Sequence, residues 1–215
     1  MTPLLRIDEP GADPHGSRPW SLWALGFRPF YLLAALYAAL SVPLWALQFS
    51  GWLPAPVLAG PAWHAHELLF GFALAVIVGF LFTAGRNWSG QPTPTGTPLM
   101  ALAALWLLAR VLAHGPWVWA SAIANVAFPW AAAFFLWRGL RAGENRRNDF
   151  FVLLLALLGL ASAAVHVAPT KASDALRLGL DVVLFVMSVM AGRVVPMFTN
   201  NGAPGARADR HPLVE

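Results

Sequence analysis

The sequence predicts an all-α, polytopic transmembrane helix bundle with about six spans and both termini in the cytoplasm. Of its 215 residues, 58% are hydrophobic and only 11% are charged, whereas an ordinary soluble domain carries roughly 25% charged residues. The apolar residues fall into long uncharged runs, and about 20 residues of helix cross the hydrocarbon core of a bilayer. Helices are favoured over strands because the runs are continuous rather than alternating.

Six apolar runs, bounded by proline, glycine or arginine, are candidates for these spans. They cover residues 29–49, 64–84, 98–113, 117–137, 150–168 and 175–197. The third run is short and only the sequence HGP links it to the fourth, which predicts a tight helical hairpin. We place the bundle at residues 23–199, between flexible cytoplasmic tails at residues 1–22 and 200–215.

The basic residues orient the bundle. If the N-terminus is cytoplasmic, eleven of the 14 basic residues fall on the cytoplasmic side, and only Arg110, Lys171 and Arg177 fall outside. This asymmetry follows the excess of lysine and arginine in cytoplasmic loops of membrane proteins. The basic residues lie singly between apolar runs or in one short cluster, which is a topology signal and excludes nucleic acid as a partner.

Four histidines come together at the predicted outer face. His64 and His66 begin the second span, His114 ends the third, and His166 ends the fifth. Ionisable groups at membrane depth are costly unless paired, and they often mark functional sites. Cysteine is absent, so any metal here is held by histidine, methionine or carboxylate. We therefore predict a metal or haem site, against the alternative that these histidines are interfacial residues beside a tryptophan belt.

Helix geometry separates the two neighbouring histidines. Small residues follow Glu67 at four-residue intervals, at Gly71, Ala75 and Gly79. Glu67 is therefore expected to face a closely packed neighbouring helix. His64 and His66 point about 160° apart on a regular helix, so the two rings cannot reach one ion. The other possibility is that Pro61 starts the helix late and leaves His64 in a loop.

Two charged residues are expected to support this site. Arg110 lies four residues before His114, and Asp181 lies about two turns into the sixth span from the same outer side. Asp181 is also expected to form an intrahelical ion pair with Arg177, four residues earlier.

Three further positions have simpler interpretations. His15 and His211 lie in the predicted tails and are expected to be bystanders. Asn125, four residues before Pro129, predicts a kink in the fourth span.

Three stretches of the chain carry a family resemblance. They are LGFRPFYLLAALYA at residues 25–38, WHAHELLFGFALAVIVGFLFTAGRNWSG at 63–90 and AGRVVPMFTNNG at 191–202. Together and in this order they resemble the NnrS family, bacterial inner-membrane proteins that contain haem and copper and are linked to nitric oxide metabolism. The positions that match the family's pattern are Gly26, Arg28, Pro29, His64, His66, Glu67, Asn87, Trp88, Gly192, Arg193, Pro196 and Thr199.

The resemblance implies cofactors and residue roles that the pattern of residues alone does not name. It implies haem and copper. Together with the histidine cluster predicted at the outer face, it makes His64, His66, His114 and His166 the expected cofactor-binding residues. The metal ligands among them are expected to be His64, His66 and His166. The residues expected to support them are Glu67, Arg28, Arg110, Asp181 and Arg193. Arg28 and Arg193, on the cytoplasmic side, are expected to anchor helix ends or to pair with haem propionates.

The resemblance also implies partners. Family members are about twice this length, so the chain resembles an N-terminal half that a second half-bundle or a homodimer completes. The lipid bilayer is the expected surrounding, and nitric oxide is the expected small-molecule ligand.

The leading hypothesis is a haem- and copper-binding protein of the bacterial inner membrane that takes part in denitrification or in the response to nitrosative stress. One alternative is a transporter of metal ions or protons that uses intramembrane histidines and acids. Another is a purely structural membrane subunit. The sequence carries no hydrolytic or transferase signature and leaves open whether the chain turns over a substrate.

Overall fold

The computed structural model describes residues 21–209, except residues 55, 57, 59, 145, 204 and 206. The expectations for residues 1–20 and 210–215, including those for His15 and His211, lie outside the described residues.

Every regular element in the described part of the chain is helical. In chain order the elements are η1 (Ser21–Ala24), α1 (Phe27–Phe49), α2 (Gly60–His66), η2 (Glu67–Ala73), α3 (Leu74–Ser89), α4 (Thr97–Leu112), α5 (Val118–Ala142), η3 (Arg146–Asn148), α6 (Phe150–Val167), η4 (Pro169–Lys171) and α7 (Ala172–Gly202). Elements η1, η3 and η4 are short 3₁₀ helices, whereas η2 is a π-helix. Elements α2, η2 and α3 form one helix of 30 residues.

The predicted helical membrane bundle is confirmed. Among the described residues, five helices are long and apolar enough to cross a membrane, and α4 is a shorter apolar helix. The boundaries follow the predicted runs closely. Helix α4 ends at Leu112 and α5 begins at Val118, which is the tight hairpin that the short HGP link predicts.

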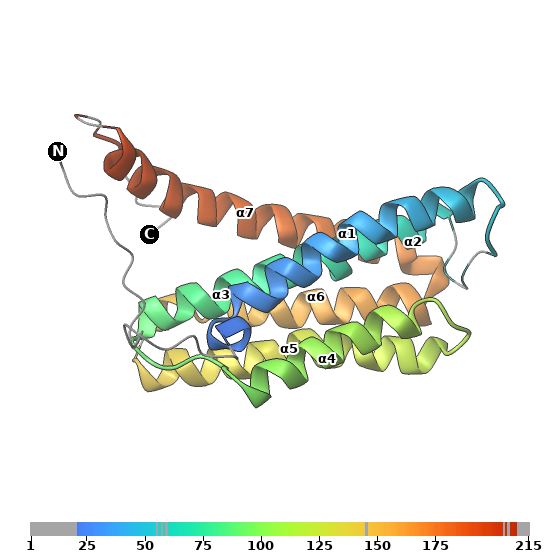
Figure 1. Ribbon diagram of the computed structural model, residues 1–215, viewed down its shortest axis with the longest axis horizontal. Coiled ribbons are helices and arrows are strands. Elements are labelled where there is room, and N and C mark those ends of the chain that lie inside the picture. Colours follow the sequence, from blue (N-terminus) through green and yellow to red (C-terminus); the bar gives the residue numbers. More distant parts are fainter. Residues whose placement is uncertain are drawn as a thin grey trace.

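The helices run up and down along the long axis of the molecule (Figure 1). Helix α5 packs against α3, α4 and α6, α1 crosses over α3, and the C-terminal half of α7 diverges from the rest. We call the end with α2, the α4–α5 link and the α6–α7 link the histidine end. The opposite end, where α1 begins and α3, α5 and α7 end, is the arginine end.

Small residues set the close approach of α1 to the long central helix. A Cβ atom at Gly79 would lie 3.0 Å from Phe30 Cβ, and a Cβ atom at Gly71 would lie 2.8 Å from Tyr37 Cε1. The ladder of small residues after Glu67 therefore faces α1, as the four-residue spacing predicts. Such contacts matter because van der Waals packing, rather than the hydrophobic effect, drives helix association in lipid.

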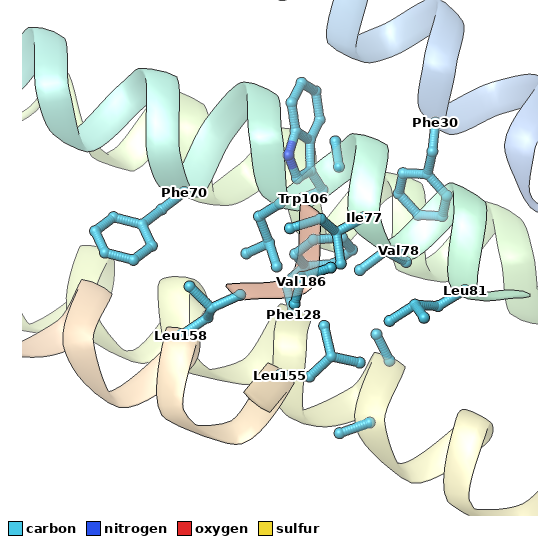
Figure 2. Close-up of a cluster of buried hydrophobic side chains, with 14 of the residues drawn as sticks. Phe30, Phe70, Ile77, Val78, Leu81, Trp106, Phe128, Leu155, Leu158 and Val186 are labelled. Carbon is cyan, nitrogen blue, oxygen red and sulfur yellow. The ribbon is translucent and has the colours of Figure 1, made fainter. Parts of the chain in front are cut away.

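An apolar core fills the middle of the bundle. Figure 2 shows aromatic and aliphatic side chains from several helices packed together, including Phe30, Phe70, Phe128, Leu155 and Leu158. Each of these five side chains is almost fully buried. The core lies between the two ends of the bundle and separates their polar residues.

Candidate functional site

The site is built around a local change in helix type. His66 is the last residue of α2, and Glu67 begins the π-helix η2. π-helical segments are rare and frequently occur at functional sites. Glu67 and Gly71, four residues apart, lie on one face, because a Cβ at Gly71 would lie 3.3 Å from Glu67 Oε2. Gly71 lacks a side chain, and a Cβ there would lie 3.0 Å from Arg110 Nη1.

The Glu67 carboxylate is 1% exposed and accepts hydrogen bonds from side chains of three helices. Its Oε2 accepts from Arg110 Nη1 on α4 at 2.6 Å and from the Tyr37 hydroxyl on α1. Its Oε1 lies 2.7 Å from Nδ1 of His66 on α2, and an ionised carboxylate can only accept, so Nδ1 carries the proton. A buried charge is tolerated when it is paired and hydrogen-bonded in this way.

Arg110 extends this network to α5. The side chain is buried, and its Nη2 donates to Asn125 Oδ1. The guanidinium carbon lies 6.0 Å from the centroid of the Trp106 ring. Trp106 Nε1 in turn donates to the backbone oxygen of Gly71 at 3.1 Å. The guanidinium is thus fixed between η2, α4 and α5, with its charge directed at Glu67.

The rings of His66 and His166 lie side by side next to this network. Their ring centroids are 4.7 Å apart with the planes at 74°. His66 is fully buried, and its Nε2 lies 2.9 Å from Ser162 Oγ on α6. His166 Nε2 has only long contacts, 3.4 Å to Ser121 Oγ and 3.5 Å to Asn125 Nδ2. The two imidazoles therefore form a close pair contributed by α2 and α6.

His114 lies in the same region. One of its ring nitrogens is hydrogen-bonded, and the other has no partner among the described residues. Its Nδ1 lies 2.8 Å from the backbone oxygen of Arg110, so Nδ1–H donates. Its Nε2 is buried and has no hydrogen-bond partner among the described residues. The ring packs edge-on against Trp63, with centroids 5.1 Å apart. A backbone hydrogen bond at one nitrogen with a free lone pair at the other is typical of histidines that bind metals.

His64 lies apart from the other three histidines. It is helical, so the alternative that Pro61 leaves it in a loop is wrong. Its ring stacks on Trp45 of α1, with centroids 4.2 Å apart and planes at 25°. This direction differs from that of His66, as helix geometry predicts. In the described part of the chain, no group of three or more histidine, aspartate and glutamate side chains surrounds a common point that could hold a metal ion.

A cavity of about 330 Å³ opens beside the histidine pair. It lies at the histidine end, between α2, α4, α5, α6 and the start of α7, and its lining includes Ser121, His166 and Ala172. His166 is the histidine that lines this cavity, whereas His66 lies behind it in the network.

The other predicted supporting residues do not join this site. Asp181 and Arg177 are exposed on α7 and form no ion pair in the described structure, so the predicted pairing is wrong. At the arginine end, Arg28 Nη1 donates to the Ser21 backbone oxygen at 2.6 Å. Arg193 Nη1, at the same end, donates to Asn148 Oδ1 at 2.7 Å. The apolar core separates these two arginines from the histidines.

Sequence reasoning did not identify three polar residues of the network. Asn125 was singled out only for a kink at Pro129, which lies inside α5, whereas its side-chain oxygen accepts a hydrogen bond from Arg110. Tyr37 and Ser162 were not singled out. The available signals were that Tyr37 is one of only two tyrosines and that Ser162 lies four residues before His166.

The fold and the site together define a polytopic helical membrane protein with a buried network of histidine, glutamate and arginine at one end. The chain belongs to the NnrS family, because the family model described as NnrS protein matches residues 21–215. Neither a curated protein nor a solved structure matches the chain.

Proposed function

We propose that this chain is a haem- and copper-binding protein of the bacterial inner membrane that takes part in the response to nitric oxide, with its metal site at the outer, histidine end. Family membership supports the cofactors and the physiological role. The proposed location of the metal site rests on one observation, the close pair of His66 and His166 beside the buried network around Glu67.

The donor set at the histidine end fits copper. Imidazole is a good ligand for copper, and ligating histidines usually donate their other ring N–H to a carboxylate or a backbone carbonyl. His66 meets this requirement through Glu67, and His114 meets it through the Arg110 backbone oxygen. His166 faces the cavity with only long contacts at Nε2. A ligand role for His66 requires the Ser162 hydroxyl to turn away from Nε2.

The same residues fit axial ligation of haem by histidine. The structure supports His114 most directly for this role, since its buried Nε2 has no partner in the described structure. His64 is proposed as a separate ligand on the side of α1, because its ring direction excludes it from the His66 pair. When bound, haem and copper would supply the redox and gas-binding chemistry, which no side chain of this chain provides.

The protein's own residues orient the imidazoles and limit access to them. Glu67 holds the His66 proton at Nδ1, which leaves the lone pair of the ring on Nε2, where it accepts from the Ser162 hydroxyl. Arg110 neutralises Glu67 and keeps it in place. The cavity of about 330 Å³ beside His166 provides space for a small uncharged ligand such as nitric oxide.

Copper analysis of single-histidine variants tests this proposal. The full chain is purified in mild detergent after expression with copper, and bound copper is measured per chain. We expect His66→Ala and His166→Ala to lower the bound copper by at least half. His15→Ala is the matched control and should leave it unchanged. Equal copper in all three variants and the unmodified chain would show that the histidine pair is not the site.

Transport of protons or metal ions is the second candidate function, because Glu67, His66 and Tyr37 form a chain of hydrogen bonds at membrane depth. The apolar core weighs against it, since residues such as Phe30, Phe128 and Leu158 fill the bundle below this network. Proteoliposomes containing the chain should therefore show no more flux than empty vesicles. Flux without bound haem would favour the transporter.

We also propose that a second copy or a second half-bundle packs on α7. Asp181 and Arg177 are exposed on this helix, next to exposed apolar side chains such as Leu184 and Phe185. Charged residues within membrane spans almost always face a bundle interior or a water-filled cavity rather than lipid. A partner on α7 would place Asp181 inside a larger bundle.

A further inference from the structure

A second cavity, of about 530 Å³, lies at the arginine end of the bundle. Its walls are the last turns of α3, the segment η3 and the C-terminal half of α7. This is the region where α7 diverges from the other helices (Figure 1). The apolar core separates it from the histidine site, and none of the four histidines lines it.

The charged and amide side chains of the cavity gather toward one end. Helices α3 and α7 both run from the histidine end to the arginine end, so Phe80 and Met190 line the part nearest the middle of the bundle. At the arginine end, Arg147 and Asn148 line the cavity together with apolar side chains such as Phe198. The cavity therefore offers an apolar floor toward the membrane centre and basic groups among apolar ones near the predicted cytoplasmic surface.

Among the described residues that line the cavity, all the charges are positive. Two arginines, Arg147 and Arg193, line it, and no carboxylate is among its described lining residues. Arg193 is held in place by Asn148 Oδ1 at 2.7 Å and by the rings of Trp88 and Phe151, whose centroids lie 5.9 and 5.8 Å from its guanidinium carbon. Arg147 is exposed at the mouth. A guanidinium held in place and an exposed one together suit an anionic group with several oxygens.

We propose that this cavity binds one anionic phospholipid, with the phosphate at Arg147 and Arg193 and an acyl chain along Phe80 and Met190. Basic pockets between transmembrane helices on the cytoplasmic side bind anionic headgroups. The neighbouring side chains Val195 and Phe198 are 58% and 63% exposed, which places the cavity next to the lipid-facing surface. A free phosphate would use the arginines but leave the apolar floor uncovered. The proposal is independent of the cofactors at the histidine end.

Native mass spectrometry of the full chain tests this binding. The protein in mild detergent is mixed with equal amounts of phosphatidylglycerol and phosphatidylcholine that carry the same acyl chains. We expect phosphatidylglycerol to be retained at least fivefold more. Arg147→Gln should lower this retention about fivefold, the effect of one arginine at an anionic surface. Arg146→Gln is the matched control, because Arg146 is exposed and adjacent but does not line the cavity.

A filling variant and a competitor distinguish the cavity from general surface charge. Val194→Trp, which fills the wall on α7, should lower retention of phosphatidylglycerol without removing a charge. Excess inorganic phosphate should leave the bound lipid in place. Equal retention of the two lipids, or equal losses in Arg147→Gln and Arg146→Gln, would overturn the proposal. A bound haem that Arg147→Gln removes would overturn it as well, because haem would then occupy the cavity.

Discussion

Glu67 links side chains from three helices at the histidine end. Its two oxygens bind Tyr37, His66 and Arg110, which belong to three different helices. The pairing neutralises Arg110, which is itself buried. Removing one member of a buried ion pair costs about 3–5 kcal/mol, because the remaining charge has no partner.

We therefore expect Glu67→Gln to lower the free energy of unfolding by about 3–5 kcal/mol, measured as a lower midpoint of thermal unfolding in detergent. Glu144→Gln is the control, since Glu144 is exposed in a turn. Equal midpoints for the two variants would contradict the central role of the buried pair.

Tyr37 contributes one hydrogen bond to the same carboxylate, and bonds to charged groups contribute about 1.5–3 kcal/mol. Tyr37→Phe should lower the unfolding midpoint, but by less than Glu67→Gln. The chain's only other tyrosine, Tyr31, is 40% exposed, so Tyr31→Phe should have little effect. If the two tyrosine variants unfold alike, the contact between Tyr37 and Glu67 does not stabilise the fold.

At the scale of elements, the π-helix η2 determines how the network packs. It begins at Glu67 and contains Gly71, which lies against Tyr37 and Arg110. A side chain at position 71 would collide with both residues. The absence of a side chain there is therefore part of the site, although Gly71 makes no side-chain contact of its own.

Gly71→Ala should destabilise the protein by about 1–3 kcal/mol, the usual cost of adding atoms to a filled region. The same substitution at Gly139, inside α5, is the control. There the nearest heavy atom to a new Cβ, Ser89 Oγ, lies 4.0 Å away, so Gly139→Ala should be neutral or stabilising. Circular dichroism during heating measures the unfolding midpoints of both variants. A Gly71→Ala variant as stable as the unmodified chain would contradict the close packing.

The sequence predicts the helices better than it predicts the network. Apolar runs are sums over many residues, so they predict all the spans within a few residues. The π-helix has no sequence signal, because nothing in ELLFGFA distinguishes it from an α-helix. Partners such as Tyr37 and Ser162 lie 30 and 96 residues from the groups they bind. The predicted ion pair between Asp181 and Arg177 was wrong because i, i+4 spacing permits such a pair but does not require it.

For the whole molecule, the surroundings of α7 are incomplete. Its C-terminal half diverges from the bundle, and it exposes both charged and large apolar residues. The histidine site and the proposed lipid cavity both include residues of α7 or contact it. A partner that covers α7 would therefore affect both ends of the protein.

A single-cysteine experiment tests whether that partner is a second copy. The chain has no cysteine, so Leu184→Cys introduces one thiol on the exposed face of α7. We expect oxidation in membranes to give a crosslinked dimer. Leu160→Cys on α6, where the leucine is exposed to a similar degree, should remain monomeric. Crosslinking of both variants, or of neither, would contradict a homodimer through α7.

The most direct test of the central claim is an optical spectrum of the purified full chain after expression with haem and copper available. The account predicts a Soret band that is lost or shifted on replacing at least one of His64, His66, His114 and His166 by alanine, and that is unchanged in His15→Ala. A colourless protein without bound copper, correctly folded by circular dichroism, would contradict it.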